Sequence, residues 1–217
     1  MGDEQKDNIL KIILLGETFV GKTSLINVFF KNQFDENIGN TLGSSFIQKT
    51  IETNNGNYTL KIWDTAGQER FRCLNKIFIK NSNIAIFVYD ITRKSTFKEL
   101  SYWINYVNEY LGNNNVIYGI VGNKSDLYDK EKEVKQKYPD MEFDIVELKE
   151  GYDFAEKNDA LFCQTSSKEG APEFSLFIRK LVEKFILKKQ FIKTKTFTIK
   201  EEEIGDENGD EKKKCCK

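Results

Sequence analysis

The sequence predicts an α/β domain whose sheet is covered by helices on both faces. Two observations lead to this prediction. Short apolar segments of strand type alternate along the chain with segments of helical periodicity, which is typical of parallel strands joined by crossover helices. The turn sequence Asn54-Asn55-Gly56-Asn57 stands between two adjacent strand segments. One edge of the sheet is therefore predicted to be an antiparallel hairpin.

Each element is predicted from its own pattern. Short apolar runs predict strands at 9–15, 46–53, 58–64, 84–89, 116–122 and 160–164. Helical periodicity predicts helices at 22–31, 96–111, 149–157 and 172–188. The last helix carries a stripe of apolar residues that we interpret as a core face rather than a partner groove: Phe174, Phe177, Ile178, Leu181, Val182, Phe185 and Ile186.

Length and composition limit the possible functions. The 217 residues, 39% of them hydrophobic, suffice for one domain of ordinary size and a tail. A formal net charge of -1 provides no basic field, so nucleic acid is not expected as a partner. Four cysteines and no histidine predict neither a disulfide framework nor a Cys/His zinc site. The polar start of the chain and the lack of a long apolar run predict a cytosolic protein.

The segment 16–23 carries the most specific chemistry. It has the spacing G-x-x-x-x-G-K-[ST] and stands between a predicted strand and a predicted helix, where backbone N–H groups and the helix dipole bind phosphate. The alternative is an ordinary glycine-bearing turn. Thr23 is also predicted to coordinate Mg²⁺. The predicted phosphate-binding residues here are Gly16, Phe19, Val20, Gly21, Lys22, Thr23 and Ser24.

A second motif, Asp64-Thr65-Ala66-Gly67-Gln68, ends another predicted strand. Ligands of open α/β sheets bind at the carboxyl ends of strands. Asp64 is therefore predicted to hold Mg²⁺ through water, and Gly67 to offer its N–H to the γ-phosphate. Taken alone, an acidic residue at the end of a strand is a cap or turn residue about as often as it is a metal-binding residue.

Two later motifs predict recognition of the base. Asn123-Lys124-Ser125-Asp126 follows a predicted strand, and the Asp126 carboxylate can accept hydrogen bonds from the N1–H and the amine of guanine. Adenine lacks this pair of donors, so the motif favours GTP over ATP. The loop Gln164-Thr165-Ser166-Ser167-Lys168 is predicted to close the guanine pocket with the backbone N–H groups of Ser166, Ser167 and Lys168. By itself it is only a polar loop.

Together these motifs resemble the Ras superfamily of small GTPases, from about residue 10 to residue 185. Within it, the stretches 64–72 and 89–92 and the cysteine pair near the end resemble the Rab family. The resemblance implies the P-loop NTPase (small GTPase) fold with a six-stranded sheet. It also implies GTP/GDP and Mg²⁺ binding, slow hydrolysis dependent on an activating protein, and a switch function in intracellular vesicle and membrane traffic.

The resemblance also assigns residues by position. Thr41 would be a second threonine ligand of Mg²⁺, and Gln68 would be the catalytic residue that orients the attacking water. Phe34 would lie against the guanine with Lys124 on its other side, although a core residue at the end of the first helix is the alternative. The expected partners are an exchange factor, a GTPase-activating protein, a GDP-dissociation inhibitor and effectors.

Three departures from the family pattern modify these expectations. Ser44 and Ser45 replace the usual apolar and acidic pair, which obscures the identity of the effector. A charged insertion near 128–142 is predicted to be a solvated loop. Thr18 and Phe19 stand where related proteins place small residues. Their bulk near the γ-phosphate predicts very slow intrinsic hydrolysis with ordinary GTP affinity, the alternative being that Phe19 simply packs against a neighbouring loop.

The composition changes after about residue 188, which predicts a GTPase domain over 1–188 and a flexible tail over 189–217. Cys215 and Cys216 resemble a double prenylation site, the alternative being an unmodified terminus. Two lipids would hold the protein on the cytosolic face of intracellular membranes, with a pool in the cytosol.

Three other functions remain possible from the sequence. An ATP-using P-loop enzyme such as a small kinase is disfavoured by the motif 123–126. A GTP-binding membrane scaffold that does not cycle would retain the fold and the nucleotide, and measured turnover would distinguish it. The third is a GTPase of the Ras superfamily that acts outside membrane traffic.

Overall fold

The computed structural model describes residues 8–31, 33–35, 44–65, 78–111, 116–129 and 144–206. These residues form a six-stranded sheet of order β2-β3-β1-β4-β5-β6. The strands are β1 (Asn8–Leu15), β2 (Ser44–Thr53), β3 (Gly56–Thr65), β4 (Ile84–Asp90), β5 (Ile117–Asn123) and β6 (Ala160–Gln164). Only β2 and β3 pair in antiparallel fashion; the other neighbouring strands are parallel. The predicted mainly parallel sheet with one antiparallel edge is confirmed.

The antiparallel edge is the predicted hairpin. Thr53 pairs with Gly56, which leaves Asn54 and Asn55 as the two turn residues. Gly56 has a φ of +98°, which is a conformation that glycine adopts without strain. The turn chemistry of this segment therefore sets the register of the whole edge.

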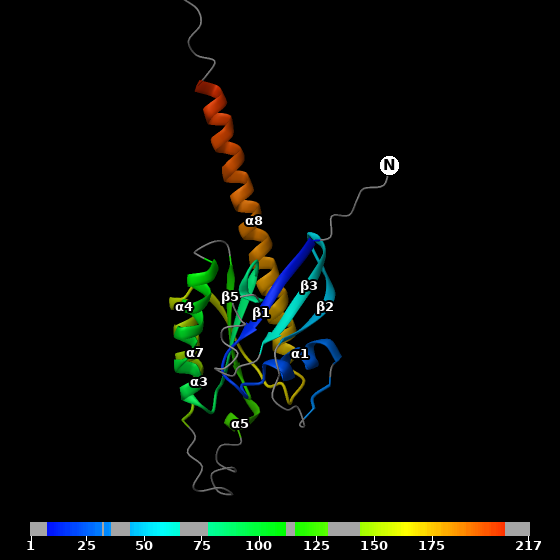
Figure 1. Cartoon of the computed structure of the whole chain (residues 1–217), viewed down its shortest axis with the longest axis vertical. Coiled ribbons are helices and arrows are strands. Elements are labelled where there is room, and N and C mark those ends of the chain that lie inside the picture. Colours follow the sequence, from blue (N-terminus) through cyan, green and yellow to red (C-terminus); the bar gives the residue numbers. More distant parts are fainter. Residues whose placement is uncertain are drawn as a thin grey trace, which may run out of the picture.

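Helices cover both faces of the sheet (Figure 1). They are α1 (Lys22–Lys31), α3 (Lys94–Lys98), α4 (Leu100–Leu111), α5 (Asp126–Asp129), α7 (Leu148–Lys157) and α8 (Pro172–Asp206). Because side chains alternate along a strand, β1 supplies both cores. Ile12 and Leu14 belong to the core under α1 and α8, whereas Ile13 and Leu15 belong to the core under α3, α4 and α7.

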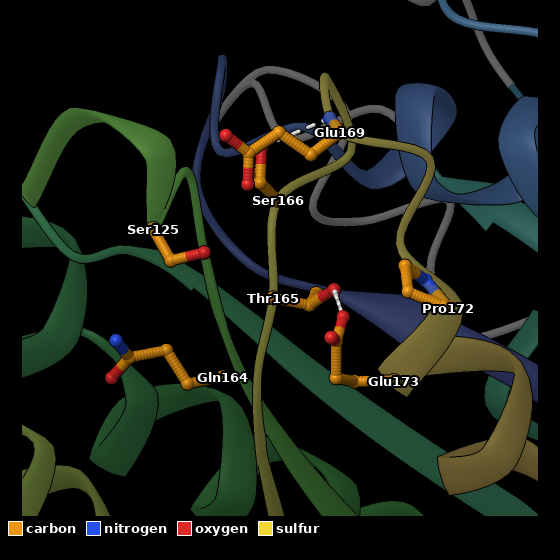
Figure 2. Close-up of a pocket in the computed structure, with 7 residues that line it drawn as sticks. All are labelled: Ser125, Gln164, Thr165, Ser166, Glu169, Pro172 and Glu173. Carbon is orange, nitrogen blue, oxygen red and sulfur yellow. Dashed lines mark hydrogen bonds between the residues drawn. The ribbon is translucent and has the colours of Figure 1, made fainter. Parts of the chain in front are cut away.

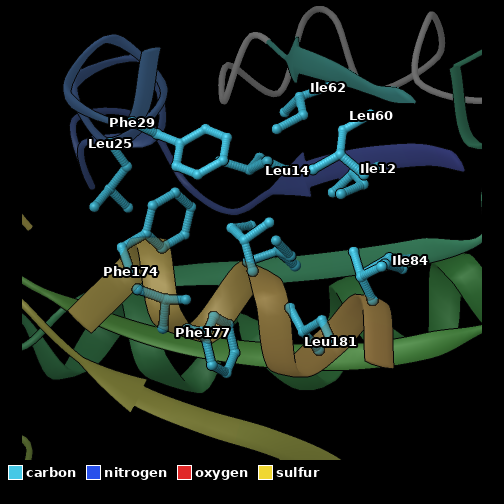
Figure 3. Close-up of a cluster of buried hydrophobic side chains, with 14 of the residues drawn as sticks. Ile12, Leu14, Leu25, Phe29, Leu60, Ile62, Ile84, Phe174, Phe177 and Leu181 are labelled. Atoms are coloured by element: carbon cyan, nitrogen blue, oxygen red, sulfur yellow. The ribbon is translucent and has the colours of Figure 1, made fainter. Parts of the chain in front are cut away.

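The stripe predicted on the last helix is a core face. All seven of its residues are buried. Figure 3 shows Phe174, Phe177 and Leu181 of α8 below the labelled side chains of β1 and β3, with Leu25 and Phe29 of α1 facing Phe174. The rings of Phe29 and Phe174 meet edge to face, with centroids 6.1 Å apart. This core fixes α1, and with it the loop that precedes α1.

Some helix boundaries differ from the prediction. The helix predicted at 96–111 is divided into α3 and α4 at Glu99. The hydroxyl of Thr96 accepts a hydrogen bond from the Asp90 N–H (3.0 Å), and this contact ties α3 to the end of β4. Helix α8 does not end near residue 188 but continues to Asp206. Its extension is rich in Lys and Glu and contains no proline, so no helix-breaking residue precedes Gly205.

Helix α8 extends beyond the sheet in Figure 1. Its buried stripe ends at Ile186, and Leu187 and Phe191 are exposed. Among the described residues, none of the helices combines the length and the apolar character needed to cross a membrane.

Candidate nucleotide-binding site

The predicted motifs lie at one edge of the sheet. The loop 16–21 follows β1, while Asp64, Asp90 and Asn123 lie at the carboxyl ends of β3, β4 and β5. Parallel strands bring these ends together, and open α/β sheets bind ligands there. Four segments that are far apart in sequence therefore meet at this edge.

The loop before α1 requires glycine at both of its ends. Gly16 has a φ of +145°, and a Cβ at this position would overlap the carbonyl oxygen of Val88. Gly21 has a φ of +94°, and a Cβ there would overlap the side-chain amide of Asn123. Between them, Phe19 adopts a φ of +64° although it is not glycine, and its side chain is 63% exposed.

Lys22 closes this loop from inside. Its Nζ donates hydrogen bonds to the carbonyls of Gly16 and Glu17, each at 2.8 Å. Burial lowers the pKa of Lys22 to about 8, although the charges of Asp64 and Glu17 act in the opposite direction. The ammonium group is thus placed at the centre of the turn, where an anionic ligand would stabilise its charged form.

The two described residues predicted to hold Mg²⁺ are in contact. Thr23 Oγ1 donates a hydrogen bond of 2.6 Å to Asp64 Oδ2. Asp64 is buried at the end of β3, and the next residue, Thr65, bonds through its hydroxyl to the Leu14 carbonyl at 2.6 Å. A hydroxyl and a carboxylate oxygen are ligands that suit Mg²⁺. The residues present therefore fit that ion.

Asn123 joins the phosphate side of the site to its base side. Its Nδ2 donates to the Val20 carbonyl at 2.9 Å, and its Oδ1 accepts from the Ser167 N–H at 3.0 Å. Both ends of the amide thus hold other parts of the site in place. Because Asn123 is buried, these bonds are shielded from competing water.

The carboxylate of Asp126 is also held in place. Ser166 Oγ donates a hydrogen bond of 2.6 Å to Asp126 Oδ1, and both residues are buried. Thr165 N bonds to the Gly122 carbonyl at 2.9 Å, so the loop 165–168 runs beside the end of β5. Its Lys168 is exposed. The structure therefore brings the two predicted base-recognition motifs together.

A cavity of about 250 Å³ lies beside the loop 165–168. Figure 2 shows its lining, in which Thr165 Oγ1 donates to Glu173 Oε2 at 3.0 Å. Ser166, which holds Asp126, is part of this lining. The cavity is lined by Ser125, Gln164, Thr165, Ser166, Glu169, Pro172 and Glu173.

The remaining predicted residues divide into two groups. Phe34 is half-buried and packs against the core under α1 and α8. This position agrees with the alternative prediction of a core residue, and the exposed part of its ring is open to a ligand. The other predicted residues lie outside the residues that the structure describes: Thr41, Gly67, Gln68, Cys215 and Cys216.

Sequence reasoning did not assign a role to Asp90. Its Oδ2 contacts Lys124 Nζ at 2.7 Å and Arg93 Nε at 3.0 Å, and its Oδ1 accepts bonds from the N–H and hydroxyl of Thr92. Burial disfavours the ionised form, but Lys124 and the Thr92 bonds outweigh it and lower the pKa of Asp90. The sequence signal that could have indicated this role is an acidic residue at the end of a strand, two residues before a threonine.

An exposed aromatic group lies on β2 and β3, on the face of the sheet opposite to Asp64. Phe46 of β2 is 51% exposed and stacks on Trp63 of β3, with ring centroids 5.3 Å apart. Trp63 also contacts Phe78, at 5.2 Å, and Lys11 Nζ lies 5.2 Å from the Trp63 ring. The rings of this group come from two strands and not from one sequence motif, which explains why the sequence analysis did not predict the group.

Comparison with known proteins agrees with this geometry. A family model described as "Ras family" matches residues 11–187. The chain belongs to the Ras family. It is 40% identical to the Ras-related protein Rab-22A of Homo sapiens over 169 aligned residues, which make up 78% of this chain and 80% of that relative. It is 39% identical over 168 residues to the Ras-related protein Rab-31 of Rattus norvegicus, with 77% and 79% covered.

Membership in the Ras family, with relatives of the Rab type, confirms the predicted fold and function. The chain is a small GTPase that hydrolyses GTP to GDP and phosphate and acts as a switch in vesicle traffic. The alternatives of an ATP-using kinase, a scaffold that does not cycle and a GTPase outside membrane traffic are not favoured.

Proposed function

We propose that the carboxyl edge of the sheet is the GTPase site, with the phosphates at 16–24 and the guanine at 123–126 and 166–168. The contact between Thr23 and Asp64 carries this proposal. It joins residues 41 positions apart and places the hydroxyl ligand Thr23 at 2.6 Å from Asp64, the carboxylate that would hold Mg²⁺ through water. A single Mg²⁺ between them and the phosphates would neutralise the charge that develops during hydrolysis.

The other phosphate ligands follow from the same geometry. Lys22 would exchange its bonds to the carbonyls of Gly16 and Glu17 for bonds to the β- and γ-phosphates. Backbone N–H groups of Phe19, Val20 and the start of α1 would surround the phosphates. Outside the described residues, we assign Mg²⁺ coordination to Thr41, a γ-phosphate contact to Gly67 and the orientation of the attacking water to Gln68.

On the base side, we assign direct recognition of guanine to Asp126. Ser166 orients its carboxylate. Asn123, which we also assign to the guanine-binding set, holds Val20 and Ser167 in register. Lys124 and Phe34 would cover the two faces of the guanine. The backbone N–H groups of Ser166, Ser167 and Lys168 would close the pocket.

Replacing Thr23 with alanine tests the proposed magnesium site. We expect GTP affinity in Mg²⁺ to fall about tenfold to a hundredfold, because a hydrogen bond or ligand bond to a charged partner is lost. Affinity is measured by titration with a fluorescent GTP analogue, with and without a chelator. The chelator should lower the GTP affinity of the unmutated protein strongly and that of the Thr23→Ala variant only weakly.

Thr50 provides a matched control, since its exposed hydroxyl contacts only Thr59, at 3.4 Å, among the contacts described. Thr50→Ala should leave both affinities unchanged. A Thr23→Ala protein with full dependence on Mg²⁺ would contradict the proposed role of Thr23.

We further propose that regulators and effectors act on this site as they do on related GTPases. An exchange factor, a GTPase-activating protein, a GDP-dissociation inhibitor and effectors are the expected partners. Exposed Phe46 stacks on Trp63 of β3, the strand that also carries Asp64 near its end, and is a suitable effector contact. Large aromatic side chains of this kind commonly dominate the binding energy of interfaces.

Membrane attachment is proposed to depend on prenyl groups at Cys215 and Cys216. Changing both cysteines to serine should move the protein from intracellular membranes into the cytosol, because two lipid chains are needed for stable anchoring. Fractionation of cells that express the tagged full-length protein measures the distribution. GTP affinity should be unchanged in the double variant, and continued membrane association of this variant would refute the proposal.

A further inference from the structure

Arg93 links two parts of the site that are distant in sequence. Its Nε donates to Asp90 Oδ2 at 3.0 Å, and its Nη2 donates to the backbone carbonyl of Thr18 at 3.2 Å. The second bond spans 75 positions in the sequence. This hydrogen bond connects the segment that follows β4 to the middle of the phosphate-binding loop.

The anchor for Arg93 is rigid. Asp90 is buried, and its other partners are Lys124 and Thr92. The backbone of Arg93 is held as well, because its N–H donates to the Asp90 carbonyl at 3.0 Å and its carbonyl accepts from the Thr96 N–H at 2.9 Å. Arg93 therefore reaches Thr18 from a support that is fixed on both sides.

The bond to Thr18 acts on the next residue. The Thr18 carbonyl and the Phe19 N–H belong to one planar trans peptide group, so they point in opposite directions. Because the hydrogen bond holds the Thr18 carbonyl oxygen toward Arg93, the Phe19 N–H must point away from Arg93. A charged donor on the oxygen also polarises the N–H, which strengthens its hydrogen bond to an anion.

This support matters because of the residue at position 19. Phe19 has a φ of +64°, a region that is unfavourable for residues other than glycine. Without an external contact, the peptide between Thr18 and Phe19 would be free to rotate toward a more favourable conformation. Its N–H would then leave the set of donors assigned to the phosphates.

We propose that Arg93 is a positioning residue that orients and polarises the Phe19 N–H for the phosphates of the bound nucleotide. It acts through the peptide group and does not itself touch the ligand. The proposal rests on the assignment of 16–24 as the phosphate site. Nucleotide release is the step on which Arg93 should act most directly.

The test compares GDP release from three proteins loaded with a fluorescent GDP analogue. Arg93→Ala should release GDP about fivefold faster than the unmutated protein, as expected for one weakened hydrogen bond. Arg93→Lys should give an intermediate rate, because an ammonium can replace one contact of the guanidinium but not its planar fork. The β-phosphorus resonance of bound GDP should shift in Arg93→Ala.

Lys94→Ala is the matched control. Lys94 is adjacent and also cationic, but its side chain pairs with Glu150 of α7, at 2.9 Å. It should change neither GDP release nor the phosphorus resonance. Thermal unfolding without nucleotide identifies any variant that is simply misfolded.

Two negative results have different meanings. If Arg93→Ala released GDP at the rate of Lys94→Ala, with an unshifted phosphorus resonance, the role of Arg93 would be disproved. If the unmutated protein did not bind GDP, the proposed phosphate site itself would be wrong.

Discussion

Replacing Phe19 with glycine should accelerate intrinsic GTP hydrolysis, which we expect to be very slow in the unmutated protein. Phe19 occupies the phosphate-binding loop with a φ of +64° and a side chain that is 63% exposed. Near the γ-phosphate, its bulk and that of Thr18 would displace the attacking water or the groups that orient it. A displacement of about 1 Å can cost on the order of a hundredfold in rate, which sets the upper limit of the gain.

Single-turnover hydrolysis of GTP measures this effect. Gln68→Leu should slow the reaction only slightly further, because the water that we assign Gln68 to orient would already be displaced. The stability of Phe19→Gly should change little. The relief of about 1 kcal/mol of backbone strain is offset by the greater unfolded-state entropy of glycine.

Tyr152 of α7 supplies a control for loss of an exposed aromatic ring, since it is 56% exposed. Tyr152→Ala should leave the hydrolysis rate unchanged. The expectation would fail if the unmutated protein hydrolysed GTP at the rate of ordinary Rab proteins and Phe19→Gly left that rate as it was.

Replacing Asp126 with asparagine should change the base preference from guanine toward xanthine. The carboxylate would accept two hydrogen bonds from guanine, and asparagine presents a donor in place of one of its acceptors. Ser166 Oγ, 2.6 Å from Asp126 Oδ1, can still hold the side chain, so the effect should be on the ligand rather than on the fold. GTP affinity should fall at least about a hundredfold, as expected for two lost bonds to a charged group.

Competition binding with GTP, XTP and ATP measures this preference. Asp159→Asn is a suitable control, since Asp159 is 90% exposed and pairs with Lys184 at the surface. It should bind all three nucleotides as the unmutated protein does. Equal binding of ATP and GTP by the unmutated protein would show that Asp126 does not select the base.

The sequence predicted the backbone of the site well, for a physical reason. The spacing of Gly16, Gly21, Lys22 and Thr23 specifies a turn and the start of a helix, and such local geometry depends mainly on neighbouring residues. The hairpin at 54–57 and the apolar stripe of α8 were predicted in the same way and are confirmed. The contact between Thr23 and Asp64 then followed from the parallel strands.

The extent of α8 was predicted less well. The expected end near residue 188 was based on a change in composition, whereas the helix continues to Asp206. Composition indicates where the core face ends, and Ile186 is indeed the last residue of the buried stripe. It does not by itself end a helix, because Lys and Glu favour helical backbone and no proline interrupts the extension before Gly205.

By itself, the sequence determined the family, the order of strands and helices, and the positions of the motifs, because each depends on residues close together in the chain. Only the tertiary structure decided how those motifs support one another. Arg93 reaches Thr18, Asp90 holds both Arg93 and Lys124, and Asn123 ties Val20 to Ser167. These contacts depend on the geometry of side chains from different strands, and no local pattern encodes a hydrogen bond between residues 75 positions apart.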